Sequence, residues 1–393
     1  MGNIINNTCN FKTKTLRILR QNPGLDDYWV IAPDIGYSGV KVFAPNSISC
    51  FPSYARKVED NEILLGIANS KHIQYRDETG TWMVGEEAQN MITSDESKDS
   101  SQALYGKNRY FSHMFKVIAR TGIAMGLFKN NYGDPTGKTI IIQTGLPPKY
   151  MKEDEKWLKE VLKGSHEFEI KLANDNWIKF NFEIMYDNIF VMPQPMGSFF
   201  SAITDSKGKS IPDARKFQTS NILIADGGFK TFDTFDINSG RLKSYDTFDD
   251  LGMKQVFQQT SNEILKTFGV DIPVYAMQKY LAEGKVTTFD RASRKTELKD
   301  FTEILNNECK AVCIDAMERI CNMYNDLIDY KYLLMTGGTG FAWLPITKDY
   351  FSGMSNLTIT TGMPKDESLS SILSNARGYY FSRVMKLKQM MGK

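Results

Sequence analysis

Residues 28–43 read YWVIAPDIGYSGVKVF, and they are the strongest indication of the fold in this sequence. The run Tyr28–Ala32 is apolar and predicts a buried strand, whereas Val40–Phe43 alternates and predicts a second one. An aspartate and two glycines lie between these runs, so the stretch predicts a β-hairpin with a glycine-bearing turn. Two glycines in one turn allow backbone amides to come close to a polyphosphate.

Three side chains of this hairpin have the chemistry of a phosphate and magnesium site. Ser38 can donate a hydrogen bond to a phosphate oxygen, and Lys41 can reach phosphate charge from the second strand. Asp34 stands at the end of the first strand and can hold a hydrated magnesium ion, which usually binds few carboxylates and several waters. For this stretch alone, an ordinary Asp-Gly hairpin turn remains the alternative.

A second stretch, residues 221–233, repeats the pattern as NILIADGGFKTFD. Asp226 follows an apolar strand, Gly227 and Gly228 come next, and Phe232–Ile237 predicts the returning strand. Two unrelated turns do not need matching aspartates at their strand ends. The pair therefore predicts a duplicated hairpin and two related domains that face one cleft.

A third glycine-rich segment, Thr336-Gly337-Gly338-Thr339-Gly340, follows the predicted buried strand Tyr332–Met335. A strand that enters a Gly-Gly turn and then a helix suits a nucleotide lying against the backbone. The same pattern occurs in many α/β folds, so it adds support only in combination with the two hairpins.

Gln194 lies between Pro193 and Pro195 at a predicted junction of strand and helix. Glutamine is not a strong base, but a fixed glutamine can orient a water, as it does in some GTPases. The alternative is a rigid connector between domains, and the two interpretations are compatible.

Two further patterns are excluded as sites. Gly133–Thr139 resembles a P-loop, but it has three residues between its glycines instead of four and precedes a strand instead of following one. Cys309 and Cys313 share one face of a predicted helix, where core packing explains them better than a metal.

The bulk composition limits the class of protein. A chain of 393 residues suits two domains. With 48 basic and 46 acidic residues it lacks the basic excess of a DNA-coating protein, so any DNA contact is expected to be indirect or local. Five sparse cysteines argue against a disulfide framework and favour the cytoplasm. The chain contains no apolar run of roughly 18 residues, so we expect no membrane span.

Strands and helices alternate along the chain, which predicts an α/β fold. We expect an N-terminal extension over 1–27, one domain over 28–193 plus 360–393, and a second domain over 194–359. Further expected features are a helical turn in 16–20, a strand at 63–67, loops at 95–101 and 205–219, and helices at 112–128, 153–162 and 369–387.

Together these segments resemble the superfamily of actin, sugar kinases and heat-shock chaperone ATPases. Asp34–Lys41 is similar to its first phosphate hairpin, and Thr336–Gly340 to its nucleotide-base motif. Asp226, Gly228, Thr231 and Asp233 fit its Asp-x-Gly-x-x-Thr-x-Asp pattern. Within the superfamily the likeness is to plasmid-segregation (ParM-type) and archaeal actin-like proteins, carried by Phe51–Ser53, Val84–Ala88, Thr144–Pro147 and Asn375–Tyr379.

The resemblance implies two actin-like, ribonuclease H-like domains that flank a nucleotide cleft holding ATP or GTP with Mg²⁺. It implies that Asp34 and Asp226 organise the magnesium through water and act with Gln194 in catalysis. Gln194 departs from the ParM-type pattern, which often has Glu there, and Lys230 replaces a residue that is commonly small. The nucleotide-binding residues implied are Gly36, Tyr37, Ser38, Lys41, Gly227, Gly228, Thr231, Gly337, Gly338 and Thr339.

The function implied is a nucleoside triphosphatase that assembles into head-to-tail filaments and segregates plasmid DNA in the cytoplasm. A DNA-binding adaptor protein would link the filament to the plasmid, with no direct membrane contact. Two alternatives stay open. One is a soluble small-molecule kinase of the same fold, for which the sequence offers no evident carboxylate base. The other is a static cytoskeletal scaffold with slow hydrolysis.

Overall fold

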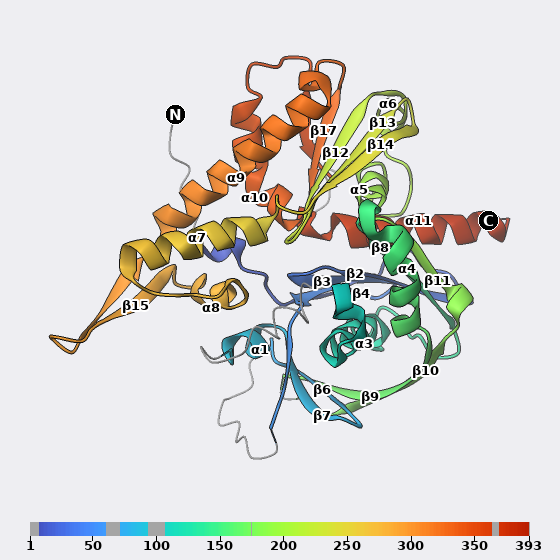
Figure 1. Ribbon diagram of the computed structural model, residues 1–393. Coiled ribbons are helices and arrows are strands. Elements are labelled where there is room, and N and C mark those ends of the chain that lie inside the picture. Colours follow the sequence, from blue (N-terminus) through green and yellow to red (C-terminus); the bar gives the residue numbers. More distant parts are fainter. Residues whose placement is uncertain (1–7, 60–70, 93–106, 174, 364–368, 393) are drawn as a thin grey trace. The chain divides into compact units, whose positions relative to one another are not determined.

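The computed structural model describes residues 8–59, 71–92, 107–173, 175–363 and 369–392 (Figure 1). The chain divides into two compact units, and each is described by itself. The larger unit comprises Lys14–Lys216 with Gly362–Lys393, and the smaller unit comprises Phe217–Thr361 with the chain up to Thr13. The strand expected at 63–67 and the loop expected at 95–101 lie outside the described residues. The domain limits expected from the sequence stay a prediction.

A six-stranded sheet in the order β1-β4-β3-β2-β8-β11 forms the centre of the larger unit. The predicted hairpin over 28–43 is confirmed as β2 and β3, which pair antiparallel with Asp34 opposite Lys41. Strand β2 runs parallel to β8, and β8 runs parallel to β11. The strands are β1 (Leu16–Leu19), β2 (Tyr28–Ile35), β3 (Gly39–Ala44), β4 (Ser47–Pro52), β8 (Thr139–Leu146) and β11 (Ile189–Pro193).

Helices cover both faces of this sheet. Helix α3 (His113–Leu127) packs on one face, and α11 (Ser374–Met390) packs on the other (Figure 1). Ser112 caps α3 by accepting the amide of Phe115 at 3.2 Å, so the predicted helix begins where its capping residue indicates. The two apolar faces of the sheet are thereby buried, which fixes the strands that carry the candidate site.

A second sheet of the larger unit lies on the far side of α3, in the order β10-β9-β6-β7-β5. Its strands are β5 (Ala55–Lys57), β6 (Ile73–Asp77), β7 (Gly80–Val84), β9 (Gly164–Leu172) and β10 (Ile178–Ile184). The other helical elements of the unit are α1 (Glu86–Asn90), η2 (Lys107–Phe111), α4 (Pro148–Leu162), η3 (Tyr186–Asn188), α5 (Gln194–Ala202), η6 (Ser371–Leu373) and the start of α6 (Ala214–Thr219).

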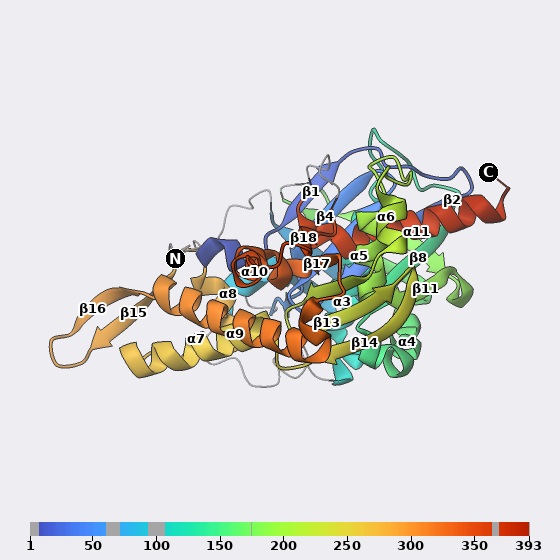
Figure 2. The same cartoon turned by 90° about the horizontal axis from the view of Figure 1, so that it is seen from above.

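The smaller unit is built on a five-stranded sheet in the order β14-β13-β12-β17-β18 and also carries a separate hairpin, β15-β16 (Figure 2). Cys309 and Cys313 are buried in α9, which confirms core packing for them. The strands are β12 (Ile222–Gly227), β13 (Phe232–Asn238), β14 (Arg241–Phe248), β15 (Lys285–Asp290), β16 (Lys295–Asp300), β17 (Tyr332–Thr336) and β18 (Thr358–Thr361). The helices are η1 (Thr8–Phe11), α7 (Met253–Phe268), η4 (Val274–Ala276), α8 (Met277–Tyr280), α9 (Thr302–Met323), η5 (Asn325–Leu327) and α10 (Gly337–Tyr350).

The two units share one sheet topology. In the larger unit the order β4-β3-β2-β8-β11 combines an antiparallel meander with parallel strands, and β14-β13-β12-β17-β18 repeats it in the smaller unit. Asp34 and Asp226 occupy the same place in the two sheets, near the carboxyl end of the strand that joins the meander to the parallel strands. The duplicated hairpin predicted from the sequence is confirmed.

Two local expectations are wrong, and one strand was not expected. Residues 16–19 form strand β1 and not a helical turn, because each of them pairs with a residue of β4. The stretch 205–219 is not all loop, since α6 occupies its end. Strand β16 was not expected because its sequence KTELKD lacks apolar alternation, and almost all its residues are exposed. Within the described residues, no helix combines the length and the apolarity needed to cross a membrane.

Candidate functional site

Asp34 is the centre of the candidate site in the larger unit. It is 4% exposed, and its two carboxylate oxygens have different partners. Lys41 Nζ lies 3.3 Å from Asp34 Oδ2, and Gln194 Nε2 donates to Asp34 Oδ1 at 3.3 Å. Gln194 is the first residue of α5, directly after β11. The ammonium group of Lys41 and the side-chain amide of Gln194 thus contact the two oxygens of one buried carboxylate.

The turn beside Asp34 depends on Gly36. Its amide donates to the carbonyl of Gly39 at 3.2 Å, which closes the turn. A Cβ at Gly36 would lie 3.0 Å from that carbonyl and 3.2 Å from Lys41 Nζ, so a side chain here would displace the lysine. Tyr37 and Ser38 are partly exposed at the tip, and the carbonyl of Ser38 accepts the amide of Ser53 at 3.0 Å.

Arg109 holds this turn in place, and no pattern in the sequence predicted that role. It is 5% exposed and donates from Nη2 to the carbonyl of Ile35 at 3.0 Å. Its guanidinium also lies over the ring of Tyr37, 4.3 Å from the ring centroid. Arg109 lies far from the hairpin in sequence, in η2, and no local pattern marks it. Only the folded chain relates it to the turn.

Asp226 is the counterpart in the smaller unit, where it is 3% exposed at the end of β12. It pairs with Thr336 of the parallel strand β17, after which Gly337 begins α10. Gly337 has φ +76°, and a Cβ there would lie 2.6 Å from Asp226 Oδ1. A Cβ at Gly227 would lie 2.5 Å from the amide nitrogen of Gly340. The backbone of two segments therefore meets closely beside Asp226, and only glycine permits this.

The glycines beside Asp226, namely Gly227, Gly228, Gly337 and Gly338, form a glycine cradle, and hydrogen bonds fix the rest of it. Thr339 donates from Oγ1 to the carbonyl of Gly228 at 2.6 Å, which ties α10 to the β12-β13 turn. The amide of Gly228 donates to the carbonyl of Thr231 at 2.8 Å. Gly338 faces open space, with no atom within 4 Å of a Cβ built on it. A ligand can therefore approach the backbone at Gly338.

Thr336 and Asp233 are two further buried polar groups, which lie in the sequence motifs but had no role predicted for them. Thr336 Oγ1 is buried, and no residue within the described ranges hydrogen-bonds to it. Asp233 accepts hydrogen bonds from Thr231 Oγ1 at 3.1 Å and Thr247 Oγ1 at 2.6 Å. Burial, reinforced by the charge of Asp226, raises the pKa of Asp233 to about 8. Thr336 directly precedes the Gly-Gly pair, so the motif itself was the signal that could have identified it.

The residues present are compatible with magnesium held through water. In the described ranges, no cluster of three His, Cys, Asp or Glu side chains is arranged to bind a metal ion directly. Magnesium usually binds one or two carboxylates together with phosphates and waters, so a single aspartate in each unit is a suitable donor set. The buried hydroxyl of Thr336, which has no hydrogen-bond partner among the described residues, lies next to Asp226 and can bond to such a water.

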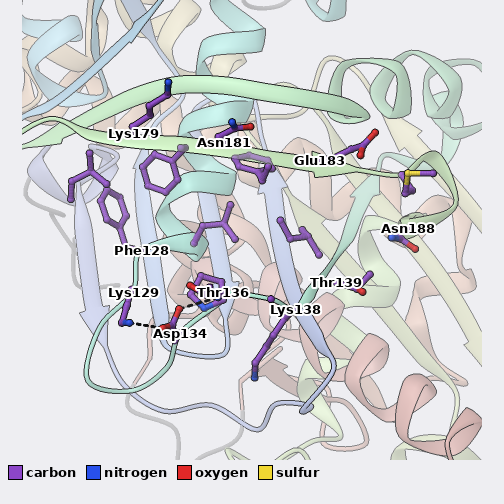
Figure 3. Close-up of a pocket in the computed structure, with 18 residues that line it drawn as sticks. Phe128, Lys129, Asp134, Thr136, Lys138, Thr139, Lys179, Asn181, Glu183 and Asn188 are labelled. Carbon is purple, nitrogen blue, oxygen red and sulfur yellow. Dashed lines mark hydrogen bonds and ion pairs between the residues drawn. The ribbon is translucent and has the colours of Figure 1, made fainter.

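The P-loop-like segment lies elsewhere in the larger unit and has no phosphate-binding geometry. Asp134, Thr136 and Lys138 line a pocket of about 700 Å³ beside β10 (Figure 3). Asp134 pairs with Lys129 at 2.6 Å and accepts the amide of Thr136, and these contacts lower its pKa. Lys138 Nζ donates to the carbonyl of Leu25 at 3.3 Å. A carboxylate occupies the loop where a P-loop would receive phosphate, in agreement with the sequence prediction.

Comparison with known proteins identifies this fold. Residues 32–197 match the family of actin-like protein N-terminal domains. A search against curated proteins gives no match. This part of the chain is therefore similar to an actin-like N-terminal domain, which agrees with the resemblance seen in its motifs.

Solved structures of similar fold extend the relationship over nearly the whole chain. A non-polymerisable quadruple mutant of pCBH ParM is 23% identical, with a TM-score of 0.69, over 92% of this chain and 99% of that one. A 15-stranded ParM filament from Clostridium botulinum is 22% identical, with a TM-score of 0.67, over 90% and 98%. The archaeal actin homologue Ta0583 in complex with ADP is 15% identical, with a TM-score of 0.59, over 91% of this chain and 99% of that one. The fold is that of the ParM-type actin-like proteins.

Proposed function

We propose that this protein is a polymerising actin-like nucleoside triphosphatase that binds ATP or GTP with Mg²⁺. The observation that carries the proposal is the Asp34 cluster, in which Gln194 and Lys41 contact the two oxygens of one buried carboxylate. Support for nucleotide binding also comes from the glycine cradle beside Asp226 and from an actin homologue of similar fold that is described in complex with ADP.

In this proposal each unit contributes one set of phosphate contacts. The amides of the Gly36 turn, together with Ser38 and Lys41, bind phosphate oxygens from the larger unit. Gly227, Gly228 and Thr231 do so from the smaller unit, and Gly337, Gly338 and Thr339 line the base and ribose. Magnesium would neutralise phosphate charge when bound, with Asp34 and Asp226 holding its waters.

Gln194 has a positioning role in hydrolysis. Its amide nitrogen donates to Asp34, so its carbonyl oxygen is directed by that bond and can accept a hydrogen bond from the attacking water. The side chain does not remove the proton itself, because an amide is not a base at neutral pH. The expected result is a water aligned with the terminal phosphate.

Assembly is the second part of the proposal. Similar chains are described as a 15-stranded ParM filament and as the Alp12 filament. Head-to-tail contacts that do not close on themselves generate such filaments. We propose that this chain assembles in the same manner and that phosphate loss weakens the filament. The ParM likeness supports a proposed role in plasmid segregation in the cytoplasm, and the net charge of +2 agrees with DNA contact through a DNA-binding adaptor.

The test measures light scattering and phosphate release together, after ATP or GTP is added to the purified protein with Mg²⁺. A scattering rise that decays as phosphate appears supports a dynamic filament. A rise without decay indicates a static scaffold, and phosphate release or acceptor phosphorylation without a rise indicates a soluble enzyme.

Two aspartate variants separate the candidate site from other carboxylates. Asp226→Ala is expected to abolish phosphate release. Asp134→Ala removes a carboxylate from the P-loop-like segment and is expected to leave release unchanged. Turnover by Asp226→Ala at the parental rate would overturn the site assignment.

A further inference from the structure

A pocket of about 400 Å³ in the larger unit is separate from the Asp34 cluster. The start of α3, the end of α4 and the start of β9 form its walls. Its basic and imidazole side chains are Lys116, Arg120, Lys163, His113 and His166, and Glu160 is the one carboxylate among the described residues that line it. Such a lining favours an anionic ligand.

Arg120 is the fixed element of this pocket. It is 7% exposed, and Nε donates to His166 Nδ1 at 3.2 Å. Nη1 donates to Tyr75 at 2.9 Å and lies 3.4 Å from Asp77 Oδ2. Its other terminal nitrogen, Nη2, has no hydrogen-bond partner among the described residues. The pocket therefore has a rigid guanidinium with an unused donor.

His166 fixes the position of Arg120, and both of its own ring nitrogens are occupied, so it does not bind an anion itself. Its Nε2 donates to the carbonyl of Leu162 at 3.0 Å, and Nδ1 accepts from Arg120. This pattern requires the neutral ring, and burial correspondingly lowers the pKa of His166 to about 4. Arg120 is therefore fixed by a neutral ring on one side and by the carboxylate of Asp77 on the other, and His166 adds no second positive charge beside it.

Two lysines and a helix end complete the arrangement. Lys116 lies in the first turn of α3 and is 3.6 Å from Glu78, whose side chain is 67% exposed. Lys163 follows α4 and pairs with Glu160 at 2.8 Å. Ser112 and His113 bring the N-terminus of α3 to the pocket wall, where helix amides favour negative charge.

We propose that this pocket binds a phosphate-class dianion, either inorganic phosphate or the phosphate group of a monoester. A planar guanidinium donor, two ammonium groups and a helix N-terminus are the donors that proteins combine around phosphate. The site is distinct from the proposed nucleotide site and does not depend on nucleotide binding.

The chain contains three histidines, which gives a direct probe. His113 and His166 line the pocket, whereas His72 does not and is hydrogen-bonded to Gln74. In protein labelled on the histidine rings, titration with inorganic phosphate is expected to shift the NMR signals of His113 and His166. The His72 signal is expected to stay in place. Sodium chloride at equal ionic strength controls for salt.

Matched lysine variants test the contacts. Lys163 pairs with Glu160, and Lys266 of the smaller unit pairs with Glu263 in the same i, i+3 spacing. Lys163→Met is expected to weaken phosphate binding about fivefold or more, whereas Lys266→Met leaves it unchanged. Glu160→Gln removes the one lining carboxylate and is expected to strengthen binding, an effect opposite in sign that misfolding cannot produce.

Two results would overturn the proposal. One is the absence of a histidine shift up to phosphate concentrations that saturate ordinary phosphate sites. The other is a shift that disappears when a slowly hydrolysed ATP analogue is added, since phosphate would then be bound by the proposed nucleotide-binding residues.

Phenyl phosphate distinguishes the two sources of the phosphate group, a monoester and the free ion. Tighter binding of phenyl phosphate than of phosphate assigns the pocket to a monoester, and the reverse assigns it to the free ion.

Discussion

The side-chain amide of Gln194 donates a hydrogen bond to Asp34 Oδ1 at 3.3 Å, although 160 residues separate the two in sequence. The bond joins the end of β2 to the first residue of α5. It also directs the other end of the Gln194 amide, its carbonyl oxygen, away from the carboxylate. The relationship links a candidate magnesium-water ligand to a candidate water-orienting group within one compact unit.

The first prediction concerns turnover. Gln194→Ala removes the amide that orients water but leaves Lys41 paired with Asp34, so nucleotide affinity is expected to change little. Phosphate release is expected to fall on the order of 10²-fold, as for other single groups that act on proton or water positioning. Gln258→Ala is the matched control, because Gln258 is an exposed α7 glutamine bonded to Asn262. Equal phosphate release by Gln194→Ala and the parent would refute the role.

The second prediction compares two adjacent glycines by urea denaturation. Gly337→Ala forces a positive φ on alanine and places its Cβ 2.6 Å from Asp226 Oδ1, so a loss of about 1–3 kcal/mol of unfolding free energy is expected. Gly338→Ala meets no atom within 4 Å and lies in α10, where alanine is favoured by about 1 kcal/mol. Equal stabilities of the two variants would contradict the close approach at Gly337.

The fold could be predicted to a large extent because its signals are local. Apolar runs that end in Asp and Gly identify β2 and β12, and their repetition indicates the duplicated sheet. Strand β1 shows the limit of this reasoning. Its sequence LRIL fits a helical turn as well as a strand, and pairing with β4 decides between them. That pairing depends on residues distant in sequence.

The candidate site likewise has residues that the sequence predicts and one that it does not. Asp34, Asp226 and the glycines could be named because a strand, a carboxylate and a tight turn are contiguous. Arg109 could not, because its contacts to Ile35 and Tyr37 arise only when η2 packs against the hairpin. The spacing of residues within one element does not indicate that its cation will contact the turn of another element.

The third prediction tests this cation. Arg109→Met leaves the buried carbonyl of Ile35 without its donor and removes the group that holds Tyr37, so the Gly36 turn is expected to loosen. Nucleotide affinity, measured with a fluorescent analogue, is expected to fall about tenfold. Arg76→Met is the control, since Arg76 also stacks on an aromatic ring, that of Trp177, but belongs to the second sheet. A comparable loss in both variants would indicate a general effect of removing a stacked arginine.

The last prediction is the pH dependence of stability set by Asp233. Its folded-state pKa of about 8 lies above the value of about 4 for an unfolded carboxyl group. Between these values the folded protein binds a proton that the unfolded chain has released, so the free energy of unfolding falls as pH rises from about 4 to 8 and then levels off. Asp233→Asn keeps an acceptor for Thr247 but cannot ionise, and is expected to remove this decline.

Urea denaturation in EDTA at several pH values checks this, with the stability difference between Asp233→Asn and the parent expected to grow toward pH 8. Asp290→Asn provides a contrast of opposite sign. A hydrogen bond from Ser293 lowers the pKa of Asp290, so this carboxylate stabilises the fold above its unfolded pKa, and its removal costs stability at neutral pH. A parent protein whose stability does not change between pH 5 and pH 8 relative to Asp233→Asn would show that Asp233 is ionised in the fold, and its hydroxyl partners would then be stabilising a charge and not sharing a proton.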